Sequence, residues 1–427
     1  MRKILFVDDE QEVVDEFKKR TGPIPDVWDI EFATSGTKAM DLLSETTYDA
    51  VVSDMYMPEM DGAELLNQVM GNYPKTVRII ISDQSDEETV LRFAKSAQQF
   101  LLKTCDIESM VFTIERACKL RDLINNKKLN MMITGISDLP SLPTLYVAIM
   151  KEMNSPNASL KKMGDIISQD LAMSAKILQA VNSAQFGLRR EITNPQHAVV
   201  YLGINTLKSF VLSSHIFSSF SEDEDYGGSS LDELWIHSLM TGRLARDIAG
   251  TMVSDKIILE EAFTTGLLHD IGKLVLSRIP RKYKQVEDFK KLNKCGRLDA
   301  EYAVLKTSHA ELGAYLLGSW ELADNVVETI AFHHNPSALL KDMIAILNQS
   351  SKIKVGKSEL NKIELLTGLT ILTSVHVANA LMMQENLTSC TGPFTYIDML
   401  YLKTLGLTEK LPEWAQFCIE FRQRIRA

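Results

Sequence analysis

The sequence predicts two structural parts: a doubly wound α/β domain with a five-stranded parallel sheet, followed by an all-α region. Over the first 120 residues, short β-rich runs alternate with amphipathic helical stretches, and parallel strands require such crossover helices. Beyond about residue 139, helical periodicity replaces the strand-like alternation. A chain of 427 residues is also too long for one ordinary hydrophobic core.

Five β-rich runs form the predicted sheet, and helix-like segments connect them. The strands are expected at residues 3–8, 29–34, 49–54, 76–82 and 99–103. The helices are expected at residues 11–20, 36–45, 62–70 and 87–96, and a final helix runs on as a connector to about residue 130. The heptad pattern of this connector is too short to establish pairing with a second copy, so a homodimer stays open.

Shifts in composition indicate the domain boundaries. We predict an α/β domain at residues 1–120, a helical linker at 121–138 and an all-α domain at 139–427. The stretch FSSFSEDEDYGGSS, near residues 217–230, is polar, acidic and rich in Gly and Ser. It separates a helical lobe at 139–220 from a second lobe at 230–427.

The composition excludes several classes of partner. The net charge of -10 and the pI near 5.4 argue against nucleic-acid or anionic-membrane binding, which requires clustered Lys and Arg. No uncharged apolar run approaches the roughly 20 residues that span a bilayer, and the N-terminus does not resemble a signal peptide. The five cysteines are scattered, which fits a reducing compartment. We therefore expect a cytoplasmic protein that binds neither DNA nor membrane.

Three carboxylates, a hydroxyl and an ammonium group fall at the ends of predicted strands. Asp8 and Asp9 end the first strand and Asp54 the third, and these strands are neighbours in the flavodoxin-like order 2-1-3-4-5. Converging carboxylates favour a hard cation such as Mg²⁺. Ser82 ends the fourth strand and Lys103 the fifth, where Lys103 would neutralise charge while Asp54 attacks a phosphoryl group. Taken singly, each residue would rather be a helix cap or a solvated surface residue, but all five at successive strand ends favour a common site.

The motifs VDDE, VVSDMYMPEMDG, IIISDQSD and FLLKT occur in this order within residues 1–120. Together they resemble the receiver domain of two-component response regulators. The resemblance implies that Asp54 accepts a phosphoryl group from a sensor histidine kinase or a phosphotransfer protein. The other implied residues are Asp8, Asp9 and the backbone carbonyl of Tyr56 around Mg²⁺, Lys103 at the phosphate, and Ser82 and Phe100 as the switch hydroxyl and switch aromatic.

One position departs from the receiver pattern. Receivers usually carry a proline after the lysine, joined by a cis peptide bond, whereas this chain has Thr104. A cis bond before a residue other than proline costs about 2.5–4 kcal/mol. We therefore expect a trans bond here, with a somewhat altered approach of Lys103.

The eight histidines begin at His197 and occur in apolar, helix-like segments. One of them directly precedes an aspartate inside the run GLLHDIGKL. A single histidine on an apolar face is more often a hydrogen-bonded core residue, but several that converge indicate a metal site. Asp270 could bridge two ions and so generate a hydroxide nucleophile. The candidate ligands are His237, His269, Asp270, His309, His333 and His334.

These six residues resemble the metal-ligand positions of the HD superfamily of phosphohydrolases. Two features depart from it: Asn379 stands at the position of the closing aspartate, and no Gly-Tyr-Pro triplet follows His334. The segments LPSLPTLYVAIMKEM, IISQDLAMSAKILQAVNSAQFG and ITNPQHAVVYLGINTLKSFVL resemble the HDOD module, an HD-related helical domain that generally serves as a signalling or scaffolding output. Within NSAQFG, Asn182 and Ser183 are expected to end a helix and Gly187 to form a turn.

Two states of the HD-like site stay open. Its histidines and Asp270 could form a polar hydrogen-bond network without metal. Alternatively, the site could hold an Fe, Mn or Zn ion with little catalytic power, because the Asn379 amide is a weaker ligand than a carboxylate.

These features predict a response regulator of a two-component phosphorelay, with a non-catalytic HDOD output that acts on a downstream signalling protein. The alternative is a metal-dependent HD-type phosphodiesterase acting on a cyclic dinucleotide or nucleotide. A transcription factor is disfavoured, because no basic recognition helix stands out.

Overall fold

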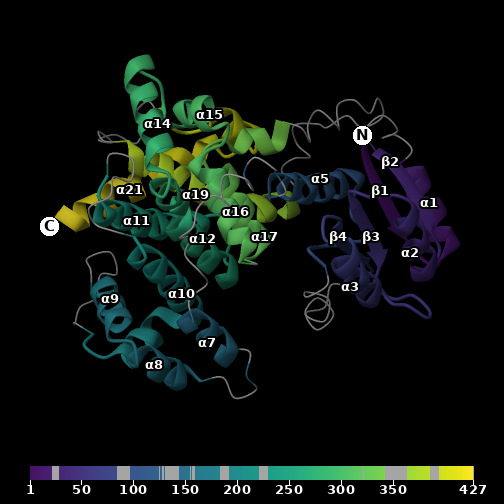
Figure 1. Cartoon of the computed structure of the whole chain (residues 1–427), viewed down its shortest axis with the longest axis horizontal. Helices are drawn as coiled ribbons and strands as arrows, with labels where there is room; N and C mark the ends of the chain where they lie inside the picture. Colours follow the sequence, from purple (N-terminus) through teal and green to yellow (C-terminus); the bar gives the residue numbers. More distant parts are fainter. Residues whose placement is uncertain are drawn as a thin grey trace. The chain divides into compact units, whose positions relative to one another are not determined.

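The computed structural model describes residues 1–21, 28–83, 97–124, 126, 129, 144–153, 155, 159–182, 192–220, 229–320, 322–341, 363–384 and 394–426 (Figure 1). The chain divides into two compact units. One comprises Met1–Lys127 with Ser337–Leu365, and the other comprises Lys128–Pro336 with Leu366–Ala427.

The first unit contains a five-stranded parallel sheet in the order β2-β1-β3-β4-β5, so the predicted fold class and strand order are confirmed. Its central strands are apolar runs, as expected for strands that helices cover on both faces. The strands are β1 (Arg2–Val7), β2 (Trp28–Ala33), β3 (Ala50–Asp54), β4 (Val77–Ser82) and β5 (Gln99–Leu102).

Amphipathic helices cover both faces of this sheet (Figure 1). Phe17 of α1 and Ile114 of α5 belong to the buried cluster on one face. Leu43 of α2 and Leu65 of α3 belong to the cluster on the other face. The helix predicted at 87–96 lies outside the described residues, as does most of the connector beyond residue 124. The described helices are α1 (Gln11–Thr21), α2 (Gly36–Glu45), α3 (Gly62–Asn72) and α5 (Ile107–Ile124).

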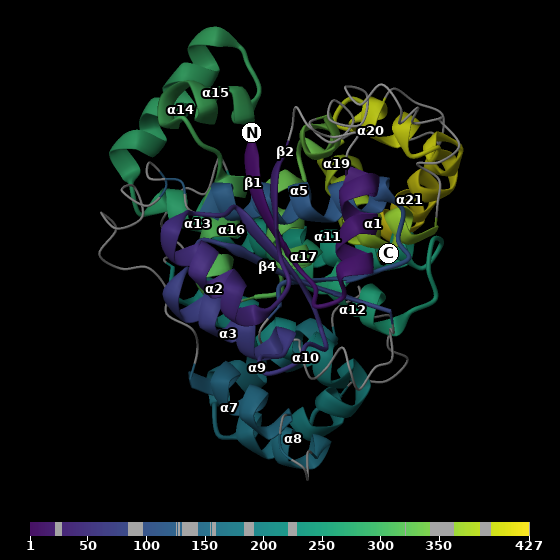
Figure 2. The same cartoon turned by 90° about the vertical axis from the view of Figure 1, so that its right-hand side faces the viewer.

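Every element described in the second unit is a helix, as predicted. Figure 2 shows α7, α8 and α9 gathered around α10. One buried apolar cluster joins these helices to α11 and α12, with Ile149, Phe210 and Phe263 among its members. The first helices are α7 (Thr144–Met153), α8 (Leu160–Ser168), α9 (Leu171–Val181), α10 (Pro195–Ser218), α11 (Leu231–Ala249) and α12 (Lys256–Leu268).

Among the remaining helices, α19 is buried from Leu369 to Leu381. A helix that is apolar on all sides belongs in a core, and α19 therefore carries His376 and Asn379 into the interior. These helices are α13 (Ile271–Ser277), α14 (Pro280–Asn293), α15 (Arg297–Leu305), α16 (His309–Ser319), α17 (Asp324–Phe332), α19 (Ile363–Met383), α20 (Met399–Thr404), the short 3-10 helix η2 (Thr408–Lys410) and α21 (Leu411–Arg426).

Glycine allows helices of this unit to approach closely. A Cβ on Gly272 of α13 would lie 1.7 Å from the backbone oxygen of His309 in α16. Gly272, the second glycine of GLLHDIGKL, therefore permits the contact that brings the start of α16 next to Asp270.

Asn182 follows α9 directly. Its amide nitrogen donates to Ile192 O at 2.7 Å, and its Oδ1 accepts from Ile192 N at 2.8 Å. This paired hydrogen bond holds the chain on the two sides of the NSAQFG segment together, while Ser183 and Gly187 lie outside the described residues. No helix of the described part of the chain is long and apolar enough to cross a membrane.

Candidate functional site

Asp8, Asp9 and Asp54 lie together at the carboxyl edge of the sheet, where ligand oxygens of all three are within 4.8 Å of one another. Parallel pairing of β1 with β3 produces this convergence, since Asp8 follows β1 and Asp54 ends β3. Lys103 Nζ, beyond the end of β5, lies 2.7 Å from Asp8 Oδ2 and 3.1 Å from Asp54 Oδ1. Asp8 also accepts a hydrogen bond from Glu10 N at 3.0 Å, so it has a local structural role as well.

Burial determines the electrostatics of this acidic cluster. It raises the pKa of Asp54 above its usual value, and Lys103 offsets only part of that effect. Burial alone would lower the pKa of Lys103, but Asp8 and Asp54 outweigh it and raise that pKa. Asp54 therefore holds its negative charge less readily than an exposed aspartate, and a bound cation would favour the charged form. The oxygen-only donor set fits Mg²⁺.

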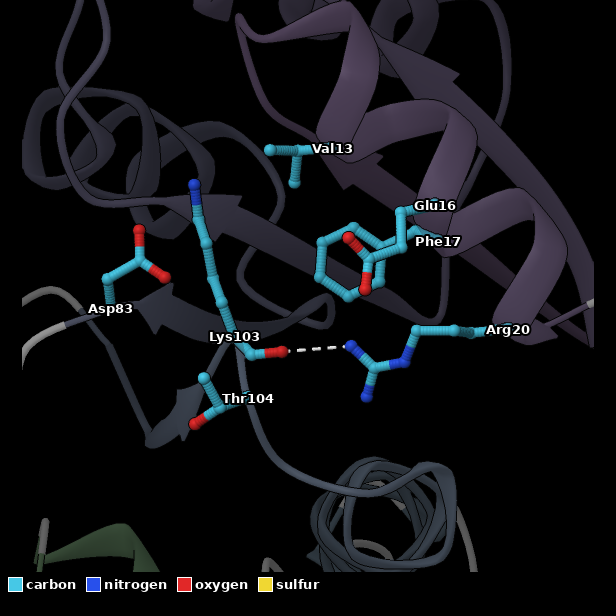
Figure 3. Close-up of a pocket in the computed structure, with 7 residues that line it drawn as sticks. All are labelled: Val13, Glu16, Phe17, Arg20, Asp83, Lys103 and Thr104. Carbon is cyan, nitrogen blue, oxygen red and sulfur yellow. Dashed lines mark hydrogen bonds between the residues drawn. The ribbon is translucent and has the colours of Figure 1, made fainter.

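Arg20 of α1 holds the loop after β5, although no sequence motif points to it. Its guanidinium donates to Lys103 O at 2.8 Å and also to Cys105 O. The peptide bond between Lys103 and Thr104 is trans, as expected. In Figure 3 both Arg20 and Lys103 line a cavity of about 500 Å³. Its other lining residues are Val13, Glu16, Phe17, Asp83 and Thr104.

The other receiver-type residues lie on β4, on β5 and in the loop after β3. Ser82 ends β4 and is buried, and its backbone oxygen accepts from Lys103 N at 2.8 Å. Tyr56 follows β3 by two residues and its side chain is exposed. Phe100 belongs to β5, but its side chain lies outside the described residues. A Cβ on Gly62 would lie 2.2 Å from Asp54 O, so only glycine lets α3 begin beside Asp54.

The six predicted HD-type ligands converge on one buried site in the second unit. Their ligand atoms form two groups, within each of which all atoms lie no more than 4.8 Å apart. Asp270, which is 1% exposed, belongs to both groups. The first group is Asp270, His309, His333 and His334, and the second is His237, His269 and Asp270.

The ligand-type residues lie mostly at helix ends, which corrects the expectation that GLLHDIGKL is one helical run. His269 follows the last residue of α12, and His333 follows α17. The last carbonyls of a helix lack partners within the helix, so His269 Nδ1 donates to Gly266 O at 2.6 Å and His333 Nδ1 to Ile330 O at 2.7 Å. A carbonyl only accepts, so Nδ1 carries a proton in both rings, and Nε2 of the neutral His333 ring presents a lone pair to the site.

Three buried atoms of the site lack a hydrogen-bond partner: His269 Nε2, His333 Nε2 and Asp270 Oδ1. An unsatisfied buried polar atom costs about 1–3 kcal/mol, and a complete hydrogen-bond network would pair such atoms. Burial lowers the pKa of His333 and of His334 well below the usual value, so both rings are neutral, as metal ligation requires. The nitrogen and oxygen donor set fits a transition metal such as Zn²⁺, Fe²⁺ or Mn²⁺.

Internal partners occupy the half of the site around Asn379. His237 Nε2 lies 3.1 Å from Asn379 Oδ1, and Lys273 Nζ lies 2.6 Å from Asp270 Oδ2. Burial lowers the pKa of His237 to about 3, so its ring is neutral and donates to the Asn379 oxygen through Nε2. Burial would raise the pKa of Asp270, but His269 and Lys273 hold it well below the usual range.

Glu301 of α15 is a residue of the site that sequence reasoning missed. It is fully buried and accepts from His309 Nδ1 at 2.7 Å and from His309 N at 2.8 Å. Burial lowers the pKa of His309 by itself, but Glu301 and Asp270 outweigh this and raise it. In the sequence, the only indication that Glu301 belongs to the site is that a charged residue stands between apolar positions of α15. Lys273 was easier to foresee as a partner of Asp270, because it follows Asp270 by three residues.

His376 lies near the site but is not among its ligand-type groups. Its Nδ1 donates to His333 O at 2.7 Å, and its Nε2 accepts from Asp398 N at 2.8 Å. Both ring nitrogens are therefore occupied by backbone groups, and His376 positions His333 from behind.

Comparison with known families identifies two domains in the chain. The chain matches the family model of the response regulator receiver domain over residues 4–115 and that of the HDOD domain over residues 139–336. It therefore joins a receiver domain to an HDOD domain, the domain composition of a response regulator, and the resemblance inferred from the motifs is confirmed.

Similar proteins cover parts of the chain. An uncharacterized protein of Treponema pallidum is 28% identical over 201 residues, which are 47% of this chain and 38% of that protein. The uncharacterized transcriptional regulatory protein YhcZ of Bacillus subtilis is 30% identical over 26% of this chain and 52% of its own length. The chain thus spans about half or less of these relatives. A crystal structure of an HDOD domain protein of unknown function from Geobacter sulfurreducens is 22% identical, with a TM-score of 0.49, over 70% of this chain and 96% of that one.

Proposed function

We propose that this protein is a phosphorylation-dependent response regulator whose receiver domain accepts a phosphoryl group on Asp54. The observation that carries the proposal is the buried cluster of Asp8, Asp9 and Asp54 with Lys103 on two of its carboxylates. The donor is a phosphohistidine of a sensor kinase or a phosphotransfer protein. We also propose that the protein is cytoplasmic and that its domains have the boundaries predicted from the sequence.

The chemistry follows from the positions of these side chains. An Asp54 carboxylate oxygen attacks phosphorus, so an O–P bond forms while the P–N bond to the donor imidazole breaks. Lys103 and the Ser82 hydroxyl then hold phosphoryl oxygens. Asp8, Asp9, Asp54 and the Tyr56 carbonyl would hold Mg²⁺, which, when bound, supplies neutralisation of the phosphoryl charge. Phe100, the switch aromatic, would change its side-chain position when the Ser82 hydroxyl binds the phosphoryl group.

A small radiolabelled phosphodonor with Mg²⁺ tests this step. We expect the wild-type chain to be labelled and Asp54→Ala to be unlabelled. A matched control is Asp61→Ala, which removes a carboxylate that caps α3 and leaves the acidic cluster in place. Equal labelling of the wild type and Asp54→Ala would refute the assignment.

For the output, we propose that the HDOD domain acts without catalysis on a downstream signalling protein. The pairing of His237 with Asn379, in place of a carboxylate, supports a non-catalytic role over the phosphodiesterase alternative. Partner binding or self-association should change when a beryllofluoride mimic loads the receiver, because added charge at Asp54 biases the receiver surface. An unchanged binding curve would contradict this coupling.

A further inference from the structure

Helix α14 presents a basic surface on an acidic protein. Residues 280–294 contain six basic and two acidic residues, whereas the whole chain has a net charge of -10. Of the two acids, Glu287 pairs with Arg297 at 2.6 Å and Asp288 is exposed. No ion pair within the described part of the chain includes any of the six basic side chains. These are Arg281, Lys282, Lys284, Lys290, Lys291 and Lys294.

The helical period places part of this charge on one face of α14, together with an apolar side chain. Arg281, Lys284 and Lys291 are exposed, and spacings of three and ten residues put them on the same side of a helix. Leu292, which is 83% exposed, follows Arg281 by about three helical turns. Tyr283 is buried on the inner side. In Figure 1 and Figure 2, α14 and α15 project from the rest of the helical unit. We call these four exposed residues the α14 stripe.

The negative charge of the chain lies in its first domain. Residues 1–120 contain 23 acidic and 13 basic residues, so they account for the whole net charge of -10. Exposed carboxylates stand at the carboxyl edge of the sheet: Glu10 follows β1, Glu59 follows β3 and Glu64 lies in the first turn of α3. Tyr56, in the same loop as Glu59, is 54% exposed. This edge therefore presents acidic side chains together with an aromatic ring.

We propose that the α14 stripe binds the acidic carboxyl edge of the receiver in a second copy of this chain. The basic side chains of the stripe meet Glu10, Glu59 and Glu64, and Leu292 packs on the Tyr56 ring. Complementary charges steer such an encounter and select the partner. Two of these contacts, one in each direction, form a closed dimer. The proposal goes beyond the proposed function and does not depend on phosphorylation.

A second copy fits the stripe better than a polyanion does. A nucleic acid or an anionic membrane would be attracted by α14 but repelled by the receiver, which carries the net charge of the chain. A second copy supplies both surfaces at once, so each acidic edge receives a basic stripe.

Sedimentation velocity of the full chain, without any affinity tag, tests self-association. We expect a dimer whose population rises with protein concentration at low salt. The dimer should dissociate as the salt concentration is raised, because salt screens exposed charges. A chain that stays monomeric at every concentration would overturn the proposal, whether its stripe binds a polyanion, its own receiver or nothing.

Charge-reversed variants test the stripe. Lys284→Glu with Lys291→Glu should weaken dimerisation by more than about tenfold, since like charges then face each other. Lys161→Glu with Lys256→Glu is the control: it reverses two exposed lysines of α8 and α12 and makes the same change in net charge. This control should alter dimerisation by less than about twofold, because single exposed charges contribute little. Equal losses in the two double variants would show that net charge alone drives association, and would overturn the proposal.

Mixing two variants gives a result that misfolding cannot imitate. Glu59→Lys with Glu64→Lys reverses the receiver edge and should also weaken self-association. In an equimolar mixture with Lys284→Glu, Lys291→Glu, every stripe meets a receiver edge of opposite charge, so the dimer should be restored. A mixture that stays monomeric would overturn the assignment of this edge as the partner of the stripe.

Discussion

The receiver cluster and the HD-like site both pair a buried aspartate with a lysine, yet their donor atoms fit different ions. In the receiver, Lys103 contacts Asp8 and Asp54 among oxygen ligands only. In the helical domain, Lys273 contacts Asp270 among imidazoles. The donor atoms around an Asp–Lys pair, more than the pair itself, therefore determine what the site can bind. Several carboxylate oxygens favour a hard ion and a phosphoryl group, whereas imidazole nitrogens favour a softer metal.

The two sites also use their backbone differently. The receiver residues follow parallel strands, whose carboxyl ends meet at one edge of the sheet. Most of these histidines follow or begin helices, and carbonyls at helix C-termini accept hydrogen bonds from Nδ1 of His269 and of His333. The strand-end arrangement gathers carboxylate oxygens and an ammonium group at one edge of the sheet, whereas the helix-end arrangement gathers imidazoles around one buried carboxylate.

The largest expected effect is that a substitution at one site abolishes the function of that site and leaves the other site unchanged. Asp270→Asn should weaken transition-metal binding by more than about 100-fold, because it removes a direct ligand, whereas loss of an outer partner costs 10–100-fold. The same variant should keep phosphoryl labelling at Asp54. Elemental analysis and a labelling assay on the same preparation measure both. Asp54→Asn should give the reverse pattern, and loss of metal from that variant would break the comparison.

A smaller effect should follow from Glu301→Gln. The amide cannot carry the charge that fixes His309 Nδ1–H, so metal affinity should fall by about 10–100-fold while the fold is kept. Competition with a chromophoric chelator measures the affinity. Glu287→Gln serves as the control, because Glu287 pairs with Arg297 at 2.6 Å and contacts no candidate ligand. Equal loss in both variants would show that general destabilisation explains the result.

Gly272→Ala should lower the free energy of unfolding by about 1–3 kcal/mol, since the added methyl group collides with the backbone of His309. Metal binding should weaken with it, because α13 and α16 must separate. Gly250→Ala is the control: its Cβ would meet only ordinary contacts of 3.4 Å or more at the end of α11. Denaturant unfolding of both variants measures the difference, and equal stabilities would contradict the close approach.

Arg20→Met should lower the free energy of unfolding of the receiver by about 1 kcal/mol, because Lys103 O and Cys105 O lose a charged donor. Phosphoryl labelling should slow as the loop carrying Lys103 loosens. Lys18→Met serves as the control on the same helix: Lys18 pairs with the exposed Asp15 and lies over the Phe32 ring, contacts that do not involve the loop after β5, so the labelling rate should not change. A normal labelling rate in Arg20→Met would show that the loop needs no clamp.

The smallest effect concerns pH and has opposite signs at two aspartates. The pKa of Asp54 is raised in the folded state by burial, so protonation favours the fold and ionisation destabilises it. Without Mg²⁺, Asp54→Asn should therefore raise the free energy of unfolding at neutral pH. This gain should shrink as the pH falls through the raised pKa.

Asp49 provides the matched control. Burial would raise its pKa, but Lys3 N–H and Arg121 outweigh this and lower it, so its ionised form stabilises the fold. Asp49→Asn should lower the free energy of unfolding at neutral pH, and that loss should disappear as the pH falls through the lowered pKa. Unfolding curves across the acidic range measure both, and equal signs for the two variants would contradict these shifts.

Much of the receiver could be predicted from the sequence, because its signals are local. Alternating apolar runs set the strands, and Asp8, Asp54, Ser82 and Lys103 each stand at a strand end. The role of Arg20 was not predictable, since it depends on a contact with a loop 83 residues away. The helical domain was predictable in class and in its list of histidines, but its helix boundaries at His269 and His333 were not, because a helix break leaves no mark in an apolar run.

The residue types at both sites, and therefore the kinds of ion they favour, were already determined by the amino-acid sequence. The tertiary structure alone decided how those residues share protons and charges. His237 meets Asn379 across 142 residues of chain, and His309 meets Glu301 through the packing of α15 against the start of α16. Hydrogen bonds and ion pairs act over a few ångströms. Which nitrogen lacks a hydrogen-bond partner, and which oxygen has one, therefore follows only from how the helices pack.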